Sequence, residues 1–108
     1  MKVTVYRNSH QTVCGFQVSG HSDYAKKGHE DILCAAVSAL TTNTVNSIEA
    51  FTEDETDCLA VNEEEGFMHF RLKKVSKESG LLLDSLVLGL TAIRESYGEF
   101  IQIRFEEV

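Results

Sequence analysis

The stretch GHSDYAKKGHEDILCAAVS, from Gly20 to Ser38, concentrates side chains that could do chemistry. It holds two histidines, three acidic residues and one cysteine, and it runs directly into an apolar segment. A cysteine near a histidine can be a nucleophile activated by the imidazole, and the same residue types can ligate zinc. Cys34 therefore has three interpretations: a nucleophile, a metal ligand or a small buried side chain.

The position of Cys34 relative to the following helix bears on this choice. Apolar residues recur at spacings of three and four, at Leu33, Val37, Leu40, Thr44, Ile48 and Phe51, and predict a helix from about residue 32 to 51. Asp31 is then the expected N-cap and Cys34 stands near the third helical position, where the helix dipole favours a thiolate. Cys34 is also one residue, about 100° of rotation, away from the apolar stripe. We expect it at the edge of the core.

The residues around Cys34 have competing structural roles. Asp31 and Ser38 share its helix face, and Asp31 could either cap the helix or orient His21. The histidine could equally be a strand-end residue bound to backbone. Cys14 alternates with Phe16 and Val18 and is predicted to lie in the core, whereas Cys58 is predicted only as a small residue in a strand.

A metal site is the sharpest chemical alternative. Its possible ligands are His21, Asp23, His29, Asp31 and Cys34. Their spacing matches no closed zinc motif, and the lone sulfur has no second cysteine beside it. The sequence therefore predicts no metal and no cofactor.

The elements that must position these residues follow from the alternation and the turn signals. Strands are predicted at KVTVYR, QTVCGFQVSG, CLAV, FMHFRL and EFIQIRFEE, with a second helix that Ser76 caps and that ends before Gly98. Gly66 is expected to supply the turn of the second hairpin. The resulting order β-β-α-β-β-α-β predicts a single α+β domain over residues 1–108, with two helices on one face of a mostly antiparallel sheet.

The second helix has more leucine than one face can use. Leu81, Leu83 and Leu88 flank its main stripe, so the helix is either deeply buried or part of a dimer interface. We expect a homodimer, because a small domain has little interior in which to bury such a helix.

Composition narrows the partners. The chain has 108 residues and a formal charge of −7, which disfavours direct binding of nucleic acid and favours a basic protein or peptide. The acidic runs EDETD and EEE (Glu63 to Glu65) strengthen that expectation, although such runs are also ordinary solvated loops. No stretch approaches the roughly 20 apolar residues of a membrane helix, and three cysteines without paired spacing fit a reducing compartment. We expect a cytoplasmic location and no membrane contact.

The motif around Cys34 resembles that of the ribosomal-processing cysteine protease family, Prp, of Firmicutes and related bacteria. The resemblance is carried by Gly20-His21, Gly28, Asp31 and the run Cys34 to Ser38, and the chain length and the two-helix layout also fit. It implies a cysteine endopeptidase that removes a short N-terminal extension from large-subunit ribosomal protein twenty-seven, cutting after a phenylalanine, and that acts as a homodimer. Cys34 is then the nucleophile and His21 the general base, with Asp31, Ser38 and Gly20 in support.

Two further hypotheses concern the loop SDYAKKGHE, residues 22–30, between base and nucleophile. Tyr24 could pack on an apolar segment of the substrate, and the loop could move as a lid. The alternatives to the protease are a non-catalytic assembly factor that binds a basic ribosomal protein through the acidic loops, and a metal-binding module.

Overall fold

The computed structural model describes residues 1–20 and 29–108, and for residues 29–31 the backbone alone. Its elements are β1 (Lys2–Arg7), β2 (Val13–Ser19), α1 (His29–Phe51), β3 (Thr56–Asn62), β4 (Phe67–Leu72), α2 (Lys77–Tyr97) and β5 (Gln102–Glu107). The predicted order β-β-α-β-β-α-β and the α+β class are confirmed.

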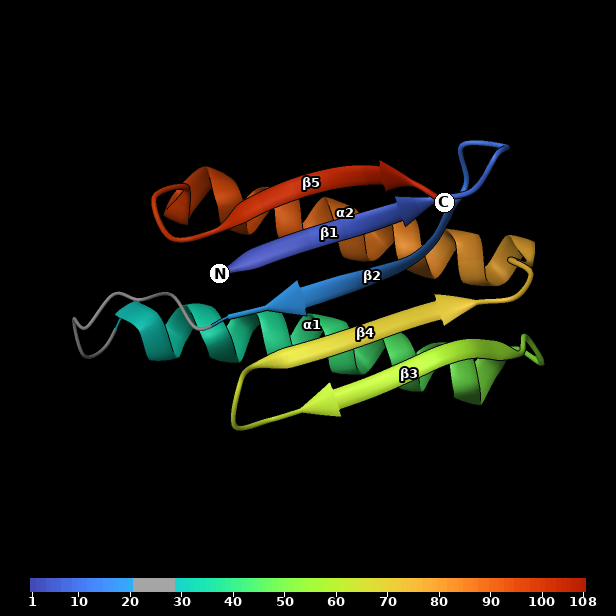
Figure 1. Cartoon of the computed structure of the whole chain (residues 1–108), viewed down its shortest axis with the longest axis horizontal. Coiled ribbons are helices and arrows are strands. Elements are labelled where there is room, and N and C mark those ends of the chain that lie inside the picture. Colours follow the sequence, from blue (N-terminus) through green and yellow to red (C-terminus); the bar gives the residue numbers. More distant parts are fainter. Residues whose placement is uncertain (21–28) are drawn as a thin grey trace.

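The strands form one five-stranded sheet in the order β3-β4-β2-β1-β5. Neighbouring strands are antiparallel, apart from β1 and β5, which run parallel. Both helices lie on the same face of this sheet, with α1 behind β3, β4 and β2 and α2 behind β1 and β5 (Figure 1). The shared face encloses the core, and neither of the two described helices covers the opposite face of the sheet.

The core follows the alternation of the central strands. Val3 and Val5 of β1 stand opposite Val18 and Phe16 of β2, and all four are at most 5% exposed. Helix α1 adds Leu33, Val37, Val45 and Ile48, and α2 adds Leu83, Leu86 and Leu90. The predicted apolar stripes are thus largely correct. The apolar residues at spacings of three and four lie on one face of each helix, and this face packs against the sheet. Phe51 is the exception: it is 76% exposed at the last turn of α1.

The start of α1 differs from the prediction. The helix begins at His29, three residues earlier than expected, so Asp31 is its third residue and the prediction of an Asp31 N-cap is wrong. No proline or glycine lies between His29 and Asp31 to stop the helix from extending. Cys34 consequently is the sixth helical residue. The dipole argument made for a third position is weaker there, since that effect falls off within the first turn.

The turn between β3 and β4 matches its prediction. Gly66 has a φ of +65°, as the turn requires. The N–H of Glu65 donates to Asn62 Oδ1 at 3.2 Å, and the N–H of Gly66 donates to the Glu63 carbonyl at 3.3 Å. The acidic turn therefore has internal hydrogen bonds that hold its shape.

Helix α2 begins and ends where predicted. Ser76 is its N-cap and accepts from the N–H of Ser79 at 3.2 Å. Gly98 follows the last helical residue, but its φ of −58° is right-handed, so the left-handed freedom of glycine is not what ends the helix. In the described part of the chain no helix is long and apolar enough to cross a membrane.

Candidate active site

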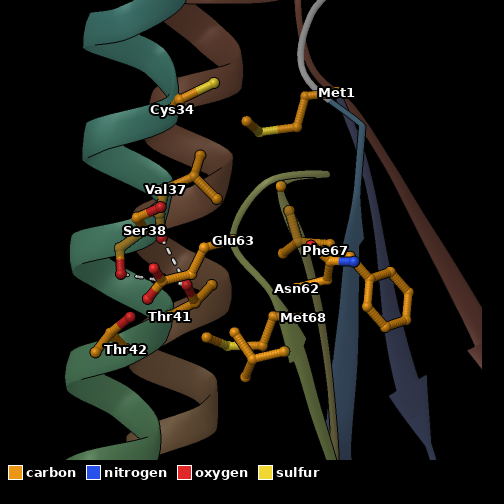
Figure 2. A pocket seen from close by; sticks show the side chains of 13 residues that line it. Met1, Cys34, Val37, Ser38, Thr41, Thr42, Asn62, Glu63, Phe67 and Met68 are labelled. Carbon is orange, nitrogen blue, oxygen red and sulfur yellow. Dashed lines mark hydrogen bonds between the residues drawn. The ribbon is translucent and has the colours of Figure 1, made fainter.

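Cys34 opens into a pocket between α1 and the β3–β4 hairpin. The pocket has a volume of about 290 Å³. Its described lining consists of Met1, Val18, Cys34, Val37, Ser38, Thr41, Thr42, Val61, Asn62, Glu63, Gly66, Phe67 and Met68. Figure 2 shows the helix as one wall and the hairpin as the other, with Cys34 at one end and Thr42 towards the other.

The helix wall of the pocket has regular spacing. Cys34, Ser38 and Thr42 are four residues apart, and Val37 and Thr41 lie beside them. Residues at this spacing share one helix face, so they form a continuous row along α1. The Thr41 hydroxyl donates to the Val37 carbonyl at 2.8 Å and is thereby directed back onto the helix. The polar side chains on this wall are therefore those of Cys34, Ser38 and Thr42, together with the Thr41 hydroxyl that is bound to the helix.

Cys34 has the exposure predicted for it. It is half-buried, next to Leu33, which is 1% exposed and packs in the core. Its side chain points from α1 towards the pocket, where the Met1 side chain approaches from the opposite wall (Figure 2). A thiol in this position can reach a bound molecule, which a fully packed cysteine cannot do.

The other two cysteines have different surroundings. Cys14 is 5% exposed, as predicted for a buried residue, and burial raises the pKa of its thiol. It lies at a register shift between β1 and β2, where Arg7 pairs with Val13 and Tyr6 with Gly15. Val13 rather than Cys14 therefore joins the core cluster. Cys58 is half-buried opposite Arg71, on the sheet face without helices. Burial and a raised pKa make Cys14 a poor nucleophile.

Only some of the other predicted site residues fall within the part of the chain that the structure describes. His21, Tyr24 and loop residues 22–28 lie outside the described residues, while residues 29–30 of the predicted loop belong to α1. Ser38 lines the pocket four residues after Cys34. Gly20 is exposed and has a φ of +80°, a backbone conformation that favours glycine.

The metal alternative has no support in the described part of the chain. Among those residues, no group of three His, Cys, Asp or Glu side chains is placed to hold a metal ion. Of the five proposed ligands, however, only Cys34 has a described side chain.

Sequence reasoning missed the far wall of this pocket. Met1 was assigned to no element, and Val61 and residues 62–68 were predicted as strand and turn residues. Glu63 to Glu65 were also predicted as an acidic run that could attract a basic partner, but none of these residues was placed beside Cys34. Their approach to Cys34 depends on the pairing of β4 with β2 and on the packing of α1 across the sheet. No local pattern in the sequence signals that contact.

Comparisons with known proteins agree with this fold. Residues 1–102 match the model of the family described as cysteine protease Prp. The Staphylococcus aureus ribosomal processing cysteine protease Prp is 30% identical over 107 residues, which cover 96% of this chain and 97% of that protein.

Solved structures give the same result. The crystal structure of the S. aureus protease with a covalently linked product peptide has a TM-score of 0.85 at 29% identity, over 97% of this chain and 98% of that one. The Streptococcus mutans protein SMU.848 has a TM-score of 0.83 at 27% identity, over 99% of this chain and 94% of that one. The chain belongs to the cysteine protease Prp family, and its class of activity is that of a cysteine protease.

Proposed function

We propose that this protease removes the short N-terminal extension of large-subunit ribosomal protein twenty-seven, cutting after a phenylalanine, with Cys34 as nucleophile and His21 as general base. The observation that carries the proposal is the position of Cys34, half-buried and open to the pocket between α1 and the hairpin. The S. aureus relative has been crystallised with a substrate peptide and with a covalently linked product peptide. A covalent peptide is what a nucleophilic cysteine mechanism would leave.

The course of β2 supports His21 as the partner of Cys34. Val18, near the end of β2, lines the same pocket as Cys34. His21 follows three residues later, after the left-handed turn at Gly20. Three residues span at most about 10 Å, a distance that allows the proposed approach of the imidazole to the thiol.

In the proposed mechanism His21 takes the proton from Cys34 and the thiolate attacks the scissile carbonyl. The protonated imidazole then gives its proton to the leaving amine, and water releases the acyl group. The N–H groups of residues 29–32, which α1 leaves without helical partners, would stabilise the oxyanion. Asp31 would orient His21, since it does not cap the helix, and Ser38 would support the pair from the next turn.

The pocket suits an apolar peptide segment. Met1, Val18, Val37, Val61 and Met68 are apolar residues of its described lining, whereas the ring of Phe67 points away from α1 (Figure 2). A phenylalanine before the scissile bond could be held by such side chains, with thioether–aromatic contact from methionine. Tyr24 would add an aromatic contact from the loop.

Homodimer formation is part of the proposal and rests on α2. Leu81 and Leu88 are 71% and 74% exposed, although Leu83 between them is fully buried. They are seven residues apart and share one helix face, which a second copy could cover. A substrate that enters the ribosome implies a cytoplasmic site of action.

The test is mass spectrometry of a peptide that spans the N-terminal extension of the same organism's ribosomal protein. The peptide is incubated with wild type, Cys34→Ala and His21→Ala. We expect a single cut after phenylalanine by the wild type alone. An assembly factor without catalysis would instead bind the peptide and leave it intact, and zinc in the purified protein would favour the metal-binding alternative. No cut, or equal cutting by Cys34→Ala, refutes the proposal.

A further inference from the structure

A single carboxylate stands in the otherwise apolar and neutral pocket beside Cys34. Among the described lining residues, Glu63 alone has an acidic side chain. It comes from the turn of the β3–β4 hairpin and extends towards the face of α1 that carries Ser38 and Thr41 (Figure 2). The hydrogen bonds at Asn62 and Gly66 hold that turn in shape, so the side chain starts from a fixed backbone.

Among the described residues, Glu63 forms no ion pair with a lysine, arginine or histidine. Glu55, by contrast, is paired with Lys73 at 3.3 Å. Glu64 and Glu65 follow it in the same turn, and the chain as a whole has a formal charge of −7. The local potential is therefore negative, and a cation that enters the pocket is attracted.

Building on the proposed function, we propose that Glu63 is a specificity-determining residue that selects a lysine or arginine in the peptide substrate, a few residues from the scissile bond. Glu63 is exposed to solvent, so a peptide bound over the pocket would displace water from its carboxylate, and a cation on that peptide would replace the lost interaction. The guanidinium or ammonium group would pair with Glu63, while its aliphatic stem contacts the apolar lining. The substrate is then an apolar segment with a basic residue at a defined distance.

The geometry of α1 gives that distance. The row from Cys34 to Ser38 and Thr41 spans four to seven residues of helix, or about 6 to 10 Å at 1.5 Å per residue. An extended peptide advances about 3.3 Å per residue. A peptide lying along the row with its scissile carbonyl at Cys34 therefore brings its second to fourth residue from that bond opposite Glu63. A basic residue much further away would not reach it.

The experiment measures kcat/KM for a set of peptides in which one lysine is moved through the positions on both sides of the scissile bond. Each is compared with the same peptide carrying norleucine, which keeps the apolar stem and removes the charge. For wild type we expect the ratio of lysine to norleucine to peak at one position within four residues of the cut. The expected size is roughly two- to fivefold, typical of an exposed ion pair.

Variants of the turn assign the preference to one side chain. In Glu63→Gln the lysine-to-norleucine ratio should fall close to one, and in Glu63→Lys a glutamate peptide should become the better substrate at that position. Glu65→Gln, which removes the same charge from the same turn but outside the described pocket lining, should keep the wild-type ratio.

The outcomes separate this inference from the proposed function. If the wild type cleaves the peptides but prefers lysine over norleucine at no position, the role of Glu63 is overturned. The protease assignment then stays intact. A preference that persists in Glu63→Gln, or that Glu65→Gln loses equally, also overturns it. Absence of cleavage of every peptide counts against the proposed function itself.

Discussion

The carboxylate of Asp54 accepts two hydrogen bonds from Ser76, from its backbone N–H at 3.0 Å and from its hydroxyl at 2.6 Å. Asp54 follows the end of α1, and Ser76 is the N-cap of α2. The pair therefore ties the end of one helix to the start of the other. The Ser76 side chain, and to a smaller extent the Ser79 side chain, lower the pKa of Asp54 below its ordinary value of 3.8.

That shift predicts a specific dependence of stability on pH. A carboxylate whose pKa is lowered in the folded state stabilises the fold above its ordinary pKa, and this contribution is lost as the pH falls through the folded pKa. We expect Asp54→Asn to reduce the free energy of unfolding by about 1 kcal/mol at pH 7, a modest value because the site is partly exposed. The difference from wild type should shrink as the pH falls below 3.8.

Urea unfolding followed by circular dichroism at several pH values between neutral and acidic would measure this difference. Ser76→Ala, which removes the hydroxyl partner and the N-cap, should shift stability in the same direction. An Asp54→Asn variant whose loss of stability is the same at every pH would contradict the linkage.

The pocket beside Cys34 offers a test of where the peptide lies. Ser38 is exposed and lines the pocket one turn after the cysteine. Ser38→Phe should fill part of that space and raise KM for the peptide roughly tenfold, equivalent to about 1.4 kcal/mol of lost binding. Ser9→Phe makes the same change in the exposed turn between β1 and β2, outside the described pocket lining, and should leave KM unchanged. Equal KM values for Ser38→Phe and wild type would place the peptide elsewhere.

The exposed leucines of α2 predict the interface of the proposed homodimer. Leu81→Glu and Leu88→Glu should each shift the protein towards the monomer, because a buried charge without a partner is costly. Sedimentation velocity over a range of concentrations would measure the change. Phe51→Ser, at the equally exposed end of α1, is the control and should keep the wild-type assembly. A dimer that survives both glutamate variants would exclude this face of α2.

Much of the fold was predictable because local physics decides it. The alternation in β1 and β4, the three-and-four spacing of both helices, Ser76 as a cap and Gly66 in a turn each depend on residues within a few positions of one another. The start of α1 was not predictable in this way. Aspartate is a favourable N-cap residue, but neither His29 nor Glu30 prevents helix formation. Helix α1 therefore starts at His29.

The candidate site likewise has one feature that local spacing predicts and others that depend on tertiary packing. The position of Cys34 at the edge of an apolar helical stripe follows from local spacing, because one residue of offset rotates a side chain by about 100°. The residues that face Cys34 across the pocket depend on long-range packing. Glu63 is 29 positions away along the chain and reaches the pocket because β4 pairs with β2 and α1 packs across the same sheet. Contacts of that kind depend on strand order and helix packing, and no window of sequence encodes them alone.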